Sequence, residues 1–258
     1  MTTTPVQLTR EVRFQVPSNR EAVSLPPRNS WAGWPRTMSL APFVTIRATA
    51  AGPVQSTGYI ADVKLLDRVV RDASIDLLIE SAVSKTCTLT LTQNLFKAIA
   101  EQLPDPIELS RLELQTTPHQ ILSVTRRDTA MTILTHQFEF SAAHRLHCEE
   151  LSDEENRNLF GKCNNPNGHG HNYVLDISVA CRANETFDLH AFEATVREHA
   201  VQPFDHKHLN VDVSDFTNLN PTVENIASVV WKKLAPHVDT LHCVRVYETP
   251  KTWAEVTG

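Results

Sequence analysis

The chain contains an internal repeat, and this repeat limits the folds that it can adopt. Three segments of the first half recur in the same order in the second half, at offsets of 126, 131 and 132 residues. The paired segments are Ala61-Asp62-Val63 with Phe187-Asp188-Leu189, Gln93-Asn94-Leu95 with Glu224-Asn225-Ile226, and residues 112–118 with residues 244–250. The first two pairs belong to amphipathic helical patterns, and the third alternates like a strand. We interpret the chain as two copies of one module; generic helix-and-strand patterning is the competing explanation.

Each copy is predicted to contain two strands, a helix, a loop, a second helix and two further strands or strand fragments. In the second copy we predict strands at 133–142, 171–182 and 241–248, and helices at 188–200 and 221–235. The helix at 221 has start signals, because Asn220 can cap it and Pro221 suits its first position. A polar segment around 125–130 separates the copies. It predicts domains at 1–128 and 129–258.

Composition excludes several classes of protein. The 258 residues are 41% apolar and 21% charged, which is typical of a soluble globular protein with a sizeable core. The net charge of −6 gives no electrostatic case for binding nucleic acid. No run of about 18 apolar residues and no apolar signal segment is present, so we expect neither a membrane span nor secretion. The five cysteines form no CxxC pair and favour a reducing cytoplasm.

The segment from Cys163 to Tyr173 carries the clearest chemical signal. It contains His169 and His171, and two histidines two positions apart on a strand point to the same face. His144 ends the preceding predicted strand. If the two strands are neighbours, three imidazoles meet and leave one position open, as a catalytic zinc site requires. An isolated His-Gly-His also arises by chance, but eleven of the twelve histidines follow residue 130.

Other residues offer acid–base and binding groups, each with a simpler explanation beside it. Cys163 is a candidate base or nucleophile near the metal. Asp205 and His206 can relay a proton, although these residue types are also common in solvated loops. Glu224 lies in the first turn of a predicted helix, where it can simply stabilise the helix end. Glu248 ends an apolar strand and can hold the amidine edge of a pterin or guanine through two hydrogen bonds, or lie exposed at the strand end.

Together these motifs resemble the 6-pyruvoyl tetrahydropterin synthase family over roughly residues 133–258. The resemblance is carried by residues 140–147, 151–156, 160–173, 205–207, 224–225 and 247–249. It implies the tunnelling fold, an α+β fold in which an antiparallel sheet carries two helices on one face and associates into barrels. With the repeat, the expected fold class is a tandem pair of tunnelling-fold modules.

The resemblance also implies an activity. Such an enzyme is a zinc-dependent lyase that converts 7,8-dihydroneopterin triphosphate to 6-pyruvoyl tetrahydropterin and eliminates triphosphate. The implied residues are His144, His169 and His171 as Zn²⁺ ligands, Cys163, Asp205 and His206 as catalytic groups, and Glu248, with Thr222 and Glu224 nearby, as substrate-binding groups. The implied assembly is a homo-oligomer with active sites at module interfaces.

Two other functions stay open at this point. The 6-carboxy-tetrahydropterin synthases of the deazapurine pathway share the zinc site, but their cysteine usually lies three residues before the His-Gly-His. Here five residues separate Cys163 from His169, which favours the pyruvoyl reaction. A non-catalytic pterin-binding protein is the second alternative, although binding alone needs no proton relay.

The first copy lacks these chemical groups. Aligning the strand at Phe43 with the strand at Tyr173 puts Ser39-Leu40-Ala41 at the His-Gly-His positions. Gln93 then replaces Glu224, and Thr116 replaces Glu248. We therefore predict a degenerate, non-catalytic first module and one zinc ion per chain.

Overall fold

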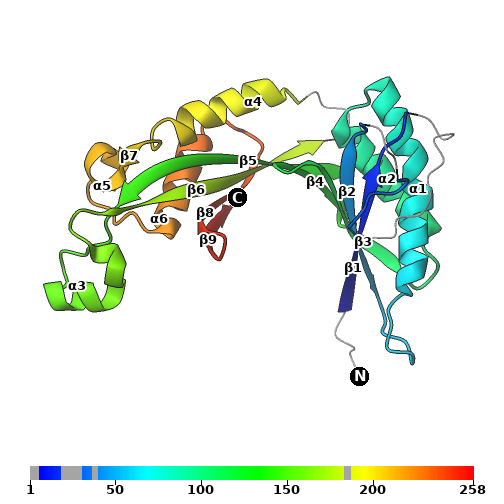
Figure 1. Ribbon diagram of the computed structural model, residues 1–258, viewed down its shortest axis with the longest axis horizontal. Helices are drawn as coiled ribbons and strands as arrows, with labels where there is room; N and C mark the ends of the chain where they lie inside the picture. The colour runs from blue at the N-terminus through cyan, green and yellow to red at the C-terminus, as the bar shows by residue number, and fades with distance from the viewer. Residues whose placement is uncertain (1–5, 19–30, 37–39, 183–186) are drawn as a thin grey trace. The chain divides into compact units, whose positions relative to one another are not determined.

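A computed structural model describes residues 6–18, 31–36, 40–182 and 187–258 (Figure 1). These residues form two compact units, one ending at Leu134 and the other beginning at Thr135. Cys181 and Arg182, at the end of a strand of the second unit, group with the first. We call the two parts unit 1 and unit 2.

Unit 1 is an antiparallel sheet with two helices on one face (Figure 1). Its strands lie in the order β1 (Val6–Gln15), β2 (Phe43–Gly52), β3 (Glu108–Thr117) and β4 (Gln120–Thr125), and its helices are α1 (Val63–Ser84) and α2 (Thr88–Gln102). The carboxylate of Asp62 caps α1 by accepting a hydrogen bond from the Lys64 amide. The buried residues of α1 recur every three or four positions, so one stripe of the helix faces the sheet.

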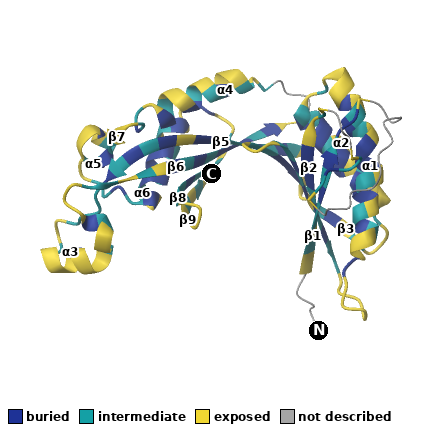
Figure 2. Cartoon of the chain, viewed as in Figure 1, coloured by how far each residue is buried: buried dark blue, intermediate teal, exposed yellow. Residues whose placement is uncertain are grey.

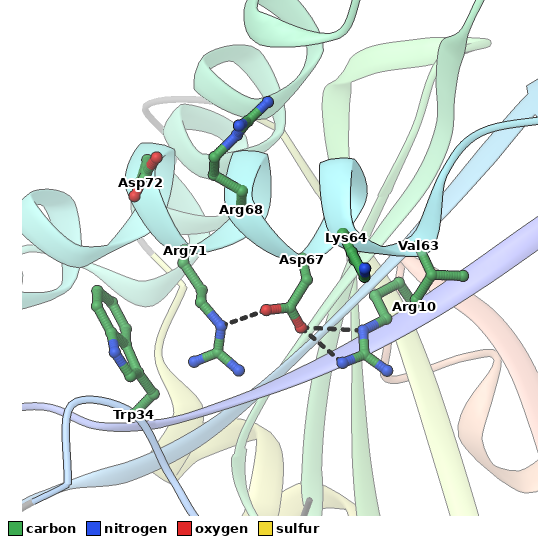
Figure 3. A pocket seen from close by; sticks show the side chains of 8 residues that line it. All are labelled: Arg10, Trp34, Val63, Lys64, Asp67, Arg68, Arg71 and Asp72. Atoms are coloured by element: carbon green, nitrogen blue, oxygen red, sulfur yellow. Dashed lines mark hydrogen bonds and ion pairs between the residues drawn. The ribbon is translucent and has the colours of Figure 1, made fainter. Parts of the chain in front are cut away.

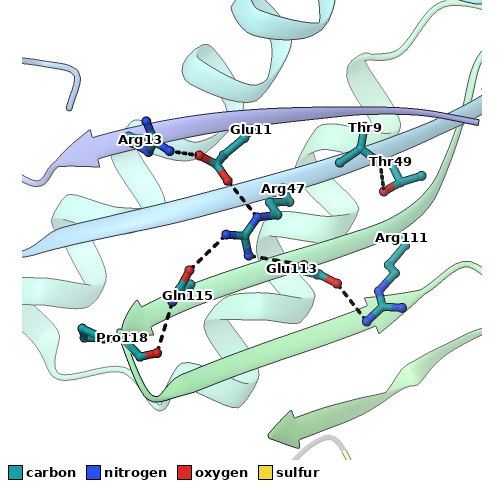
Figure 4. Close-up of polar contacts among 9 residues, drawn as sticks. All are labelled: Thr9, Glu11, Arg13, Arg47, Thr49, Arg111, Glu113, Gln115 and Pro118. Carbon is teal, nitrogen blue, oxygen red and sulfur yellow. Dashed lines mark hydrogen bonds and ion pairs between the residues drawn. The ribbon is translucent and has the colours of Figure 1, made fainter. Parts of the chain in front are cut away.

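The core of unit 1 lies between sheet and helices, where buried residues gather (Figure 2). The other sheet face carries charged and hydroxyl side chains. On this face Arg47 bridges Glu11 and Glu113 across neighbouring strands, and Thr9 pairs with Thr49 (Figure 4). On the helical side Asp67 of α1 accepts hydrogen bonds from Arg10 of β1 and from Arg71 one turn further along (Figure 3). Ion pairs therefore connect neighbouring strands, and connect β1 to α1, on the surface of this unit.

Unit 2 repeats the arrangement, with additional short elements. Its sheet has the order β5 (Asp128–His144, which enters this unit at Thr135), β6 (His169–Arg182), β8 (Leu241–Thr249) and β9 (Thr252–Thr257). The short strand β7 (Lys207–His208) pairs with the end of β5. Its helical elements are α3 (Asp153–Phe160), a 3₁₀ turn at Gly161–Asn164, α4 (Leu189–Val196), a π turn at Arg197–Val201, α5 (Leu209–Asp212), a 3₁₀ turn at Ser214–Phe216 and α6 (Val223–Leu234). The buried face of α6 includes Ile226, Val230 and Leu234, as its period predicts.

Several predicted boundaries differ from the structure. The strand predicted at 133–142 is longer at both ends and spans Asp128–His144. The helix predicted at 221–235 begins at Val223, and the hydroxyl of Thr222 caps it instead of Asn220. Pro221 stays outside the helix, and the side chain of Asn220 accepts a hydrogen bond from the His147 amide. The strand predicted at 171–182 begins two residues earlier, so both histidines of the His-Gly-His lie within it. The helix predicted at 188–200 changes to a π turn after Val196.

Helix α3 was not predicted, although it carries a complete capping box between Ser152 and Glu155. Within the described part of the chain, no helix is long and apolar enough to cross a membrane.

Candidate metal centre

Three histidines and a glutamate from three strands meet in unit 2. His144 ends β5, His169 and His171 begin β6, and Glu248 lies near the end of β8. One candidate ligand atom from each of the four residues lies within 4.8 Å of the others. The predicted grouping of the three imidazoles therefore exists, and it has a carboxylate as a fourth member.

The donor atoms of this cluster suit a cation. His144 is fully buried, and its Nδ1 lies 2.8 Å from the carbonyl oxygen of Pro221. Because a carbonyl oxygen only accepts, Nδ1 carries the proton and Nε2 directs its lone pair into the cluster. The Nε2 atoms of His144 and His169 are 3.2 Å apart, and Nε2 of His171 is buried without a hydrogen-bond partner among the described residues. Nitrogen lone pairs turned toward one point are what a metal ion such as Zn²⁺ binds.

The electrostatics of the cluster keep the ligands in their metal-binding forms. Burial, together with the neighbouring imidazoles, holds the pKa of His169 below its usual value. Burial also lowers the pKa of His171. Glu248 Oε1 lies 3.3 Å from Nε2 of both His144 and His171, and the contact with His144 lowers the pKa of the carboxyl group. A lowered pKa favours the neutral imidazole at His169 and His171 and the carboxylate form at Glu248, and these are the forms that bind a cation.

The position of Glu248 was only partly predicted. Sequence reasoning identified it as a pterin-binding group or an exposed strand end, but in this structure its carboxylate contacts two of the clustered histidines. The signal was present in the alternation of β8, because Val244 and Val246 are buried and Glu248 follows them on the same face. The remaining determinant is the strand register, in which Tyr247 pairs with Val174 of β6, and this register is known only from the structure.

Cys163 lies beside the cluster, on the 3₁₀ turn between α3 and β6. Its carbonyl accepts a hydrogen bond of 2.8 Å from the Leu146 amide, which ties this turn to the segment after β5. Burial, followed by the nearby Glu248 carboxylate, raises the pKa of the Cys163 thiol. A second turn follows, in which the Gly168 amide donates to the Asn165 carbonyl at 2.8 Å. Gly168 has a φ of 72°, and a Cβ there would lie 2.7 Å from His208 Nε2, so this position requires glycine.

Asp205 and His206 form a pair at the edge of the sheet. Asp205 accepts a 2.9 Å hydrogen bond from the Ser141 amide, and its other oxygen lies 2.9 Å from His206 Nδ1. The Ser141 hydrogen bond and then the His206 contact lower the pKa of Asp205. The His206 imidazole is 83% exposed. Within the described residues, no recorded contact joins this pair to Cys163.

The remaining predicted substrate-binding residues lie at the start of α6. Thr222 supplies the helix cap, and Glu224 is exposed in the first turn. No hydrogen bond or ion pair connects either residue to the histidine cluster in the part of the chain that is described. Their structural roles at the helix end are therefore observed, and their substrate roles stay predictions.

Comparisons with known proteins identify the family. A family model for 6-pyruvoyl tetrahydropterin synthase matches residues 133–258. The 6-pyruvoyl tetrahydrobiopterin synthase of Homo sapiens is 43% identical over 123 residues, which cover 45% of this chain and 84% of that protein. The chain belongs to the 6-pyruvoyl tetrahydropterin synthase family. The Drosophila melanogaster 6-pyruvoyl tetrahydrobiopterin synthase is 38% identical over 135 residues, covering 50% of this chain and 80% of that protein. The predicted family and enzyme class, a carbon–oxygen lyase, are confirmed.

A solved structure also resembles the chain over its full length. The uricase of Arthrobacter globiformis aligns with a TM-score of 0.50 and 9% identity, covering 100% of this chain and 94% of that chain. At this identity the likeness concerns the fold alone. The 6-pyruvoyl tetrahydropterin synthase model matches only residues 133–258, whereas the uricase alignment also includes unit 1. The predicted tandem fold class is confirmed.

Proposed function

We propose that the chain converts 7,8-dihydroneopterin triphosphate to 6-pyruvoyl tetrahydropterin and eliminates triphosphate in a zinc-dependent reaction. The observation that carries the proposal is the cluster of His144, His169, His171 and Glu248 within a domain of this family. Three imidazoles whose ring nitrogens lie close together are a common donor set for catalytic zinc. When bound, Zn²⁺ would polarise the side-chain hydroxyls of the substrate and acidify the adjoining C–H bonds.

The chain's own residues would bind the pterin and move its protons. Cys163 is the proposed base, because its thiol lies beside the cluster and its thiolate can accept a proton from the substrate side chain. Glu248 would hold the N2–H and N3–H edge of the pterin through paired hydrogen bonds. Thr222 and Glu224 would line the same pocket. Asp205 would orient His206, whose imidazole exchanges protons with the thiol.

The proposed relay requires more than one copy of the chain. Cys163 and the Asp205–His206 pair are not joined by any recorded contact among the described residues, and the His206 imidazole is exposed. We therefore propose a homo-oligomer in which Asp205 and His206 of one copy approach Cys163 of another. Unit 1 would be a non-catalytic module within this assembly, and the five cysteines, all without disulfides, support a cytoplasmic location.

Product analysis tests the proposed reaction. Purified protein given dihydroneopterin triphosphate should release inorganic triphosphate and a 6-pyruvoyl pterin, identified by mass spectrometry, with about one zinc per chain in the same sample. A 6-carboxy pterin with acetaldehyde would instead identify the deazapurine-pathway reaction, which the five-residue spacing before His169 argues against. Substrate binding without any product would identify a pterin-binding protein.

A further inference from the structure

A basic cleft adjoins the metal cluster at His169. The cleft has a volume of about 770 Å³, and three cationic side chains, Arg145, Arg157 and Lys162, line it together with His169. Asp153 is the only carboxylate among the described residues that line it. The cleft therefore carries net positive charge in a chain whose formal net charge is −6.

The backbone brings two of these cations to one wall. Arg157 lies in the last turn of α3, and Lys162 follows Gly161, where the helix ends. Gly161 has a φ of 52° and a ψ of −122°, a conformation that disfavours any residue with a Cβ. This sharp change of direction places Lys162 and the adjoining Cys163 immediately after the helix. The same turn thus carries the proposed base and a cation of the cleft.

The third cation is held in place by uncharged groups. Arg145 donates from Nε to the Asn164 carbonyl at 3.3 Å, and its Nη2 lies 3.2 Å from Nδ1 of His147. Asn164 is itself buried and donates to the Leu146 carbonyl at 2.7 Å. The guanidinium is therefore positioned without being neutralised.

None of the three cations has a carboxylate within 4.0 Å among the described residues. Other arginines of the chain do have such partners: Arg10 pairs with Asp67, Arg47 with Glu11, and Arg245 with Glu255. Cations that surround a concave surface without neutralising partners attract a polyanion. Arginine and lysine are also the side chains best suited to phosphate oxygens.

We propose that this cleft binds the triphosphate group of the substrate and that Arg157, Lys162 and Arg145 donate hydrogen bonds to its oxygens. This inference rests on the proposed function for the identity of the anion. The triphosphate is esterified to the third carbon of the substrate side chain, one carbon beyond the hydroxyls expected at the metal. A substrate held at the cluster can thus extend its triphosphate past His169 into the cleft.

The cations would act on the elimination step as well as on binding. When a base removes the proton from the second side-chain carbon, a double bond forms between the second and third carbons. The bond from the third carbon to the phosphate oxygen breaks, and its electron pair leaves with the triphosphate. Lys162 and Arg157 would stabilise the added negative charge on the leaving group. The enol that remains takes a proton at the third carbon and becomes the methyl ketone.

Binding of inorganic triphosphate to metal-stripped full-length protein tests the cleft without turnover. Stripping the metal matters because triphosphate chelates zinc, so any affinity that remains comes from side chains. We expect calorimetry to show binding that weakens at least about tenfold in the Arg157→Ala/Lys162→Ala double variant, because two charge-assisted contacts are lost. The matched control is Lys97→Ala/Arg127→Ala, which removes two exposed cations of unit 1 and should bind as the native chain does.

Kinetics of the zinc-loaded protein complete the test. The Arg157→Ala/Lys162→Ala variant should raise KM for dihydroneopterin triphosphate by a similar factor. Replacing the alanine at position 162 by arginine, as in Arg157→Ala/Lys162→Arg, should recover most of that loss. Circular dichroism should show the same fold in each variant. Triphosphate binding that is equal in the native chain and the double variant would overturn the proposed cleft. If the native chain binds triphosphate through these residues but turns over no pterin, the anion site stands and the proposed function fails.

Discussion

Units 1 and 2 share their architecture but differ at the ends of their strands. Both place two helices on one face of an antiparallel sheet. In unit 2 the second strand begins at His169, whereas in unit 1 the equivalent strand begins at Phe43, after the positions that align with the His-Gly-His. Of these aligned positions, Leu40 and Ala41 are described and Ser39 lies outside the described residues. The buried residues maintain the fold, and a few strand-end residues determine whether a metal cluster can form.

The residues that replace the chemical groups in unit 1 make ordinary structural contacts. Gln93, the counterpart of Glu224, donates a 3.1 Å hydrogen bond to the hydroxyl of buried Thr132. Thr116, the counterpart of Glu248, donates to the side chain of Gln120 at 2.9 Å. Neutral groups that hydrogen-bond within the sheet and helix surface replace carboxylates. This difference predicts that loss of a cluster residue in unit 2 removes activity while the fold persists.

The largest expected effect is that of His144→Ala. The imidazole is fully buried, and its Nδ1 is fixed by the Pro221 carbonyl, so its removal deletes a preorganised donor. Metal affinity should fall by at least about 100-fold, since even loss of an outer-shell partner costs about 10–100-fold, and turnover should fall to background. Elemental analysis and product release measure both. His190→Ala removes an exposed histidine of the same unit and should change neither.

Cys163→Ala should produce a loss of a different kind. Removing a general base typically lowers kcat by about 10²–10⁴-fold, whereas the histidine cluster and its bound zinc should persist. Measuring kcat and zinc content on the same preparation separates the loss of the base from a loss of metal. Cys243→Ala, which changes a half-buried cysteine on β8, is the matched control. Full turnover by Cys163→Ala would remove the thiol from the mechanism.

Glu248→Gln distinguishes the two roles open to this carboxylate. If Glu248 anchors the pterin, the amide loses one of two charge-assisted hydrogen bonds, and KM should rise by about tenfold with metal content unchanged. If the carboxylate is instead a metal ligand, zinc should be lost in proportion to activity. Its distance of 3.3 Å from two imidazole nitrogens is compatible with either arrangement. Glu255→Gln on β9, a carboxylate paired with Arg245, serves as the control.

Much of the fold and of the candidate site could be predicted from the sequence, and the features that could not be predicted have physical causes. The order of strands and helices follows from apolar periodicity, and strand alternation brings His169 and His171 to one face. The start of α6 was placed wrongly because local capping rules favour Asn220, whereas Pro221 directs its carbonyl to His144, far away in sequence. The cluster position of Glu248 depends on the pairing of β6 with β8, which is a non-local contact.

The pair proposed as a proton relay was harder to place. Asp205 and His206 were recognised as residue types, but their position depends on a hydrogen bond to Ser141 and on β7 pairing with β5. Sequence spacing contains no information about such long-range contacts. Helix α3 was overlooked for a different reason, because it is short and largely polar and its apolar period is weak.

The smallest predicted effect concerns the stability of unit 1. Burial raises the pKa of Asp67, but the hydrogen bonds and charges of Arg71 and Arg10 outweigh it and hold the pKa below its usual value. A carboxyl group with a lowered folded-state pKa stabilises the fold above its unfolded pKa of about 3.9, and this contribution disappears as pH falls through the folded value. Asp67→Asn should therefore lower the free energy of unfolding by about 1–2 kcal/mol at neutral pH and by progressively less as the pH falls below about 3.9. Urea titrations across this range measure the difference, and the matched control is Asp72→Asn, an exposed carboxylate of the same helix with no ion pair among the described residues. Because unit 1 is proposed to lack catalysis, Asp67→Asn should keep the turnover of the native chain at neutral pH and moderate temperature. A large loss of kcat there would show that unit 1 contributes to the active site.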